Sequence, residues 1–133
     1  METKIIFVDT SVLIDYYRKK DKSKTFFFKL TQSYTIFMVS AITEYEIYIG
    51  NVSTDQLNFW NEFFKRITVL PFDSETDKIA VKIYQELKKK NKLIDIPDIL
   101  IAATALKNKL AFATLNRKHF DRIDILKKTI IEH

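Results

Sequence analysis

The feature that most constrains the fold is a short apolar run, residues 5–8, which ends abruptly at Asp9. Four apolar residues are too few for a buried helix, and they suit a strand that is covered on both faces. The segment that follows, residues 10–17, has its apolar residues at helical spacing. Asp9 is therefore expected at the carboxyl end of a strand where a helix begins, the edge at which open α/β sheets bind ligands.

The same pattern of a strand followed by a helix recurs along the chain. Further strands are predicted at residues 36–39, 67–70 and 110–114, with residues 128–131 as a short fifth candidate. Helices are predicted at residues 25–31, 41–49, 53–66, 74–92 and 97–106. Such alternation indicates parallel strands joined by crossover helices, so we expect an α/β three-layer sandwich. The 133 residues contain no linker or repeat, which predicts a single domain over residues 1–133.

The composition excludes several functional classes. The chain has no cysteine, which excludes disulfides, thiolate zinc sites and cysteine nucleophiles and suits a reducing cytoplasm. Its single glycine, Gly50, excludes the glycine-rich loops of P-loop and dinucleotide-binding proteins. The apolar stretches are too short for a membrane span or a signal peptide, so we expect a cytoplasmic protein. The formal net charge of +5 favours an anionic partner such as nucleic acid.

Three acidic residues lie at corresponding places in this pattern. Asp9 follows the first strand, Glu46 lies in the helix after the second, and Asp98 lies in the first turn of the apolar helix before the fourth. A carboxylate among apolar neighbours is costly unless it is paired, hydrogen-bonded or bound to a metal. Because the chain has only two histidines, oxygen atoms would dominate a metal site, which favours Mg²⁺ or Mn²⁺. Carboxylates that hold such ions are suited to phosphodiester hydrolysis.

Each acid also has a purely structural explanation, and spacing does not decide between the two. Asp9 suits the cap position of the helix that follows it. Glu46 is placed to close a capping box with Thr43. Asp98, next to Pro97, suits the positive end of a helix dipole.

Four segments resemble, in order, the motifs of the PIN-domain ribonucleases. They are residues 6–14 (IFVDTSVLI), residues 39–50, in which a glutamate precedes a glycine by four residues, residues 97–105 (PDILIAATA) and residues 113–120 (ATLNRKHF). Their style and the chain length look most like the VapC-type toxins of bacterial and archaeal toxin–antitoxin pairs. The resemblance covers nearly the whole chain, and it implies a five-stranded parallel sheet and a Mg²⁺- or Mn²⁺-dependent endoribonuclease.

The resemblance also implies partners and ligands. Asp9, Glu46 and Asp98 match the metal-binding acids of the family. Family membership implies an RNA substrate, a homodimer, and a cognate antitoxin that inserts a segment near the acids. A function from another class is a PIN fold that binds RNA or protein without cutting RNA. Asn116 favours this alternative, because many PIN domains carry an aspartate at that position.

Further candidates surround the fourth motif. Asn116 is neutral and binds Mg²⁺ more weakly than an aspartate, and nearby Asp121 either substitutes for it or faces solvent. Ser11 and Thr114 are placed to hydrogen-bond Asp9 or a phosphate, with local turn bonding as the alternative.

Three consecutive residues of this motif are candidates for binding RNA. Arg117 and Lys118 carry positive charge and are expected near the acids, where they would contact RNA phosphates. His119 is expected to contact the substrate or to support the structure, because water activated by a metal needs no histidine base.

Overall fold

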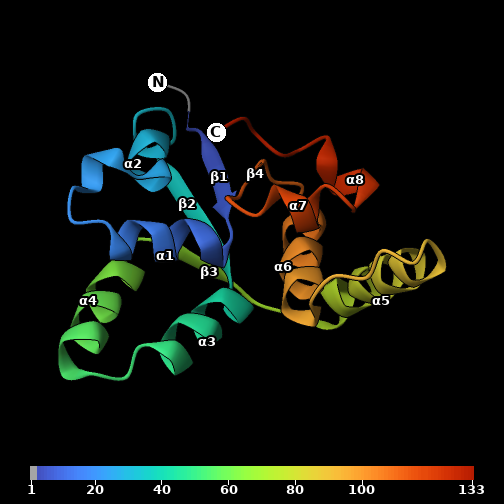
Figure 1. Ribbon diagram of the computed structural model, residues 1–133, viewed down its shortest axis with the longest axis horizontal. Helices are drawn as coiled ribbons and strands as arrows, with labels where there is room; N and C mark the ends of the chain where they lie inside the picture. The colour runs from blue at the N-terminus through green and yellow to red at the C-terminus, as the bar shows by residue number, and fades with distance from the viewer. Residues whose placement is uncertain (1–2) are drawn as a thin grey trace.

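The computed structural model describes residues 3–133, in which strands alternate with helices as the sequence predicts (Figure 1). The strands are β1 (Ile5–Val8), β2 (Ile36–Ser40), β3 (Thr68–Leu70) and β4 (Phe112–Ala113). The helices are α1 (Thr10–Arg18), the 3-10 turn η1 (Lys22–Lys24), α2 (Phe26–Thr31), α3 (Ala41–Gly50), α4 (Thr54–Phe64), α5 (Ser74–Lys89), α6 (Ile96–Lys107), α7 (Arg117–Phe120) and α8 (Asp124–Lys127). No helix within residues 3–133 is both long enough and apolar enough to cross a membrane.

The four strands form one parallel sheet in the order β3-β2-β1-β4. β1 lies between two neighbours, with Ile5 opposite Ile36 of β2 and Phe7 opposite Phe112 of β4. Because parallel strands end at the same edge of a sheet, Asp9 after β1 lies near the residue that follows β4, Thr114. The sheet thus provides the edge that the sequence pattern predicts.

The sheet has four strands rather than the expected five. Residues 128–131 contribute one parallel bridge, between Ile130 and Phe112, instead of a strand. Two hydrogen bonds of 2.9 Å support the bridge, one from the Phe112 N–H to the Thr129 carbonyl and one from the Ile131 N–H to the Phe112 carbonyl. Since α8 extends to Lys127 and β4 is only two residues long, little extended chain is left to pair.

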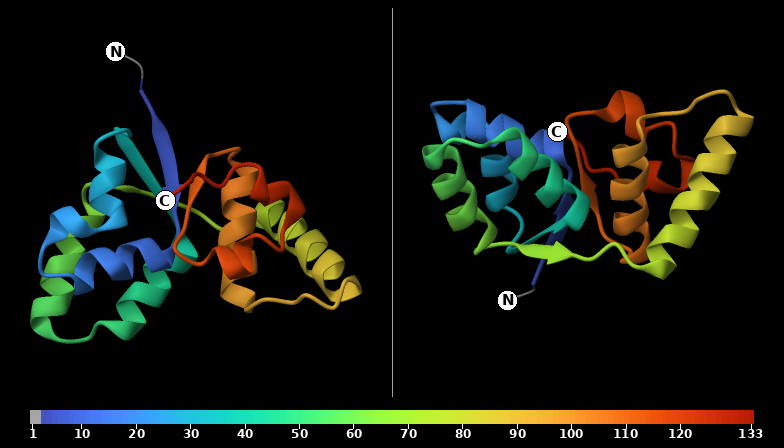
Figure 2. Two further views of the ribbon diagram at one scale, coloured as in Figure 1. Left: turned by 45° about the horizontal axis from the view of Figure 1, so that its top comes forward. Right: turned by 90° about the horizontal axis from the view of Figure 1, so that it is seen from below.

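Helices cover both faces of the sheet, which gives the predicted three-layer sandwich. α1–α4 lie on one side of the sheet and α5–α8 on the other (Figures 1 and 2). Alternate side chains of β1 enter the two cores: Ile6 and Val8 pack with residues of α1–α4, and Phe7 packs with residues of α5–α8. The sheet separates most of the two helical layers, and α3 and α6 contact each other directly beside it.

Aromatic side chains fix the position of α1 in its layer. Trp60 of α4 is fully buried, and its ring lies 5.5 Å from the ring of Tyr17 on α1. At the carboxyl end of α1, the Lys22 ammonium donates to the carbonyl oxygens of Tyr16 and Tyr17, the second at 2.9 Å. A cation there complements the negative end of the helix. These contacts hold α1, whose first turn adjoins Asp9.

Candidate active site

Asp9 is a buried carboxylate held by two hydroxyl groups. It is 3% exposed and directly follows β1. Ser11 Oγ donates to Asp9 Oδ1 at 2.7 Å, and Thr114 Oγ1 donates to Asp9 Oδ2 at 2.8 Å. Asp9 occupies the N-cap position of α1, but its side chain accepts no capping hydrogen bond from the helix. The capping explanation for the carboxylate is therefore wrong, and the contacts expected from Ser11 and Thr114 are confirmed.

The surroundings of Asp9 disfavour its charged form. Its pKa is raised from a usual value near 3.8 to about 7, chiefly by burial and also by the negative charge of Asp98. The hydrogen bonds from Ser11 and Thr114 act in the opposite direction and lower the pKa. Burial is the largest of these effects, so the carboxylate carries a desolvation penalty that a bound cation would relieve.

Glu46 is positioned by a hydroxyl from another helix. Thr10 Oγ1, in the first turn of α1, lies 2.8 Å from Glu46 Oε1 and 2.9 Å from Thr43 Oγ1. A carboxylate only accepts, so the Thr10 hydroxyl donates its one proton to Glu46 and accepts from Thr43. Ser40 is the N-cap of α3, because its Oγ accepts from the Ile42 N–H at 3.0 Å. The capping box proposed for Thr43 and Glu46 is therefore wrong.

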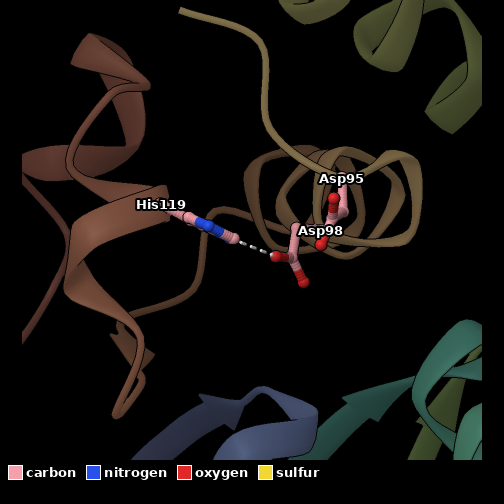
Figure 3. Close-up of side chains that lie close together, drawn as sticks. All are labelled: Asp95, Asp98 and His119. Carbon is pink, nitrogen blue, oxygen red and sulfur yellow. Dashed lines mark hydrogen bonds and ion pairs between the residues drawn. The ribbon is translucent and has the colours of Figure 1, made fainter.

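Asp98 lies in a cluster of possible metal ligands. Asp95, Asp98 and His119 each offer one ligand atom, and these three atoms lie within 4.8 Å of one another (Figure 3). Asp95 and Asp98 come from the start of α6 and His119 from α7, with 2.9 Å between His119 Nδ1 and Asp98 Oδ2. Asp98 does lie in the first turn of α6, so a helix-dipole role coexists with this cluster.

Asp95 was not predicted as a site residue. The signal is the segment Asp95-Ile96-Pro97-Asp98, in which two acids flank a proline at a helix start. Residues three apart lie on the same face of a helix. Because the proline starts the helix between them, both carboxylates can face the same metal ion.

Only some residues of the fourth motif lie near the acids. Asn116 precedes α7, and its Nδ2 lies 3.1 Å from His119 Nδ1. The Arg117 guanidinium donates to Asp121 Oδ1 at 3.1 Å, so Asp121 is engaged by its own helix and is absent from the cluster of Asp95, Asp98 and His119. Lys118 is exposed. For residues 3–133 the structure thus favours Asn116 over Asp121 as the neighbour of the acids.

The donor atoms at this edge fit a hard divalent cation. The cluster offers the carboxylates of Asp95 and Asp98 and a nitrogen of His119, and Asp9 and Glu46 offer further carboxylates outside that cluster. Mg²⁺ and Mn²⁺ prefer carboxylate oxygen, and the chain has no thiolate to offer a softer ion. Burial and the charge of Asp98 both disfavour the ionised form of Asp9, and a nearby cation would offset both effects.

The contact between Thr10 and Glu46 leads to a prediction about stability. Replacing Thr10 by valine is expected to lower the free energy of unfolding by about 1–2 kcal/mol, since a hydrogen bond to a charged group contributes about that much. Serine keeps the hydroxyl and should retain most of the stability. A double-mutant cycle with Glu46→Ala, measured by urea unfolding, checks the coupling. Equal costs of Thr10→Val with and without Glu46 would contradict it.

The sequence of the chain matches a known protein family. The sequence model of the PIN domain matches residues 6–126 of the chain. The chain belongs to the PIN-domain family. Every predicted site residue of this PIN domain, from Asp9 to His119, lies inside the matched region.

Relatives of this PIN domain carry the name ribonuclease VapC. Ribonuclease VapC1 of Methanocaldococcus jannaschii is 34% identical over 122 residues, which cover 92% of this chain and 82% of that relative. Ribonuclease VapC of Rickettsia bellii is 32% identical over 125 residues, covering 89% and 90%.

Solved structures share the fold of this PIN domain over almost its whole length. VapBC2 of Rickettsia felis, bound to a DNA fragment from its promoter, matches with a TM-score of 0.83, at 22% identity and over 96% of this chain and 97% of that chain. DNA-bound VapBC of Salmonella typhimurium matches with a TM-score of 0.81, at 26% identity and over 98% of both chains. The α/β PIN fold expected from the four motifs is confirmed.

Proposed function

We propose that this PIN domain is a divalent-metal-dependent endoribonuclease and the toxin of a toxin–antitoxin pair. The observation that carries the proposal is the convergence of acids from separate elements. Thr114 donates to Asp9 and accepts from the Asn116 N–H, and the Asn116 side chain lies 3.1 Å from His119 Nδ1, which lies 2.9 Å from Asp98. The names of the relatives, ribonuclease VapC, support RNA as the substrate. The proposed ion is Mg²⁺ or Mn²⁺, held by Asp9, Glu46 and Asp98.

The side chains of this edge have separable tasks in the proposed reaction. When bound, the ion would act as a Lewis acid toward a phosphodiester oxygen and lower the pKa of a water molecule. Ser11 and Thr114 hold both oxygens of Asp9, and Thr10 holds Glu46, so that the carboxylates keep fixed orientations.

Binding of RNA to this edge needs positive charge. The acids repel an RNA phosphate until a cation offsets their charge, which couples substrate binding to metal binding. Arg117 and Lys118 lie on α7 beside His119 and supply positive charge for neighbouring phosphates. To reach a phosphate, the Arg117 guanidinium would have to leave its contacts with Asp121 and Glu132.

The test is RNA cleavage with Mg²⁺, with Mn²⁺ and with a chelator, in the parent and in Asp98→Asn. We expect cleavage by the parent only with a metal, and a loss of at least about 100-fold in Asp98→Asn, since even the partners of metal ligands change activity by about 10–100-fold. Asp55→Asn makes the same chemical change on the exposed start of α4 and is the matched control. Equal cleavage by Asp98→Asn and the parent would refute the assigned site.

One observation favours a second function, a PIN fold that binds RNA or protein without cutting RNA. Asn116, whose amide lies 3.1 Å from His119 Nδ1, brings no charge to the acids. In the same experiment, RNA binding without cleavage under every metal would favour this function over the first.

The toxin proposal extends to partners and location. Solved structures of similar fold are complexes of VapB with VapC, which supports a cognate antitoxin as the partner of this chain. We further propose a homodimer and a cytoplasmic location. For a toxin, we expect a neighbouring gene that encodes a small DNA-binding protein, and we expect that protein to co-purify with this chain.

A further inference from the structure

The imidazole of His119 is the one nitrogen ligand in the cluster with Asp95 and Asp98. His119 Nδ1 lies 2.9 Å from Asp98 Oδ2, and its imidazole projects from α7 toward the start of α6 (Figure 3). Asp95 and Asp98 flank the same space with ligand atoms within 4.8 Å of His119. The imidazole thus reaches the acidic edge from a separate element, as the ligands of a metal site commonly do.

The spacing of these atoms fits one coordination sphere. An octahedral ion with bonds of about 2.1 Å separates neighbouring ligands by about 3 Å and opposite ligands by about 4.2 Å. The distance of 2.9 Å between His119 Nδ1 and Asp98 Oδ2 matches neighbouring ligands. The ligand atom of Asp95 lies within 4.8 Å of both, which places it beside the same ion position.

His119 Nδ1 faces the Asp98 carboxylate and the Asn116 amide. The carboxylate only accepts, so without an ion it requires a proton on Nδ1, and the amide, 3.1 Å away, can turn its oxygen toward the same proton. A cation in place of that proton would bind the carboxylate oxygen and the nitrogen lone pair together, and the Asn116 oxygen could face the ion in the same way.

We infer that His119 is a direct ligand of a metal ion that it shares with Asp95 and with Asp98, the one acid common to this cluster and to the proposed set of Asp9, Glu46 and Asp98, and that it makes Mn²⁺ the preferred ion over Mg²⁺. Mg²⁺ prefers oxygen ligands and retains its waters, whereas transition-metal ions accept imidazole. This inference rests on the proposed function for the presence of an ion, and it deepens that function by naming the ion and its nitrogen ligand.

The test uses Mn²⁺ alone as the probe, without RNA. Electron spin echo modulation of the Mn²⁺-loaded full chain is expected to show a directly bound nitrogen, and labelling histidine with ¹⁵N should change the coupling. His119→Gln retains an amide that can donate to Asp98 but lacks the imidazole, so the nitrogen coupling should disappear. The matched control is His133→Gln, because the other histidine of the chain lies against the ring of Phe26.

Calorimetric titration supplies a second measurement. The ratio of the Mg²⁺ dissociation constant to that of Mn²⁺ is expected to fall about 10-fold in His119→Gln and further in His119→Asp, where an oxygen replaces the nitrogen. Thermal unfolding verifies that both variants are folded. A Mn²⁺ spectrum without bound nitrogen, or an unchanged ratio in both variants, would overturn the inference and reduce His119 to a hydrogen-bond partner of Asp98.

The two proposals fail in distinguishable ways. RNA cleavage without a nitrogen coupling would leave the ribonuclease function intact and refute the role of His119. A nitrogen coupling without RNA cleavage would support the metal ligand and refute the ribonuclease function.

Discussion

Asp9→Asn is expected to be more stable than the parent at pH 8 and to cleave RNA at least about 100 times more slowly. Burial raises the pKa of Asp9 to about 7, so the folded chain pays for a buried charge at neutral pH that the unfolded chain does not. Three pKa units correspond to about 4 kcal/mol, and an amide that accepts from only one of Ser11 and Thr114 forfeits about 1 kcal/mol. We expect a net gain of about 3 kcal/mol.

The gain in stability of Asp9→Asn over the parent is expected to depend on pH. Because the folded pKa of Asp9 lies above the unfolded value near 3.8, the folded state binds the extra proton between about pH 4 and pH 7. The parent therefore loses stability as the pH rises through this window, and Asp9→Asn does not. The difference in melting temperature should be near zero at pH 4 and largest above pH 7.

Added Mn²⁺ distinguishes a metal-binding carboxylate from one that is only buried. The ion should raise the melting temperature of the parent and leave that of Asp9→Asn nearly unchanged, because binding to the folded state alone stabilises it. A variant that is less stable than the parent at pH 8, or one that still cleaves RNA, would contradict the role given to Asp9.

Trp60→Ala is expected to lower the free energy of unfolding by about 4 kcal/mol, the usual cost of deleting a buried aromatic ring. The ring is fully buried between α4 and Tyr17 of α1, and α1 begins beside Asp9. Such a loss is a large share of the stability of a typical domain and corresponds to a melting temperature lower by about 15 °C. Thermal unfolding followed by circular dichroism measures it.

Trp60→Phe is the matched comparison. Within residues 3–133, Trp60 Nε1 is the buried side-chain polar atom that lacks a hydrogen-bond partner. A buried donor without a partner costs about 1–3 kcal/mol, so removing it offsets much of the packing lost with the smaller ring. Trp60→Phe should stay within about 1 kcal/mol of the parent. A cost similar to that of alanine would show that Nε1 does have a partner, such as a bound water.

Much of the fold follows from local patterns in the sequence. β1, β2 and β3 and helices α1–α6 lie where apolar runs and helical spacing predict them, because each has a strong local signal. The strand predicted at residues 128–131 is reduced to a single bridge for a different reason. Their apolar residues satisfy the pattern of a strand, but whether they pair depends on how much of β4 is left exposed, which is a tertiary property.

The sequence predicts the contacts of the site less completely than it predicts the fold. Asp9 has the sequence context of a helix cap, but its carboxylate accepts from two hydroxyls, one on nearby Ser11 and one on Thr114, 105 residues away. Thr10 likewise acquires its role from Glu46 across two helices. The motifs predict the two hydroxyls that hold Asp9, those of Ser11 and Thr114, but not the contact of Thr10 with Glu46, which joins distant segments and carries no local signal.

The division of the site between the two helical layers has a consequence for how the chain is made. Asp9 and Glu46 come from the half of the chain that is synthesised first, whereas Asp98, Thr114 and His119 come from the second half. Thr114 holds Asp9, so the acids cannot be fully arranged until more than four-fifths of the chain has been translated. The proposed nuclease site of a nascent chain is therefore incomplete until synthesis of the chain is nearly finished.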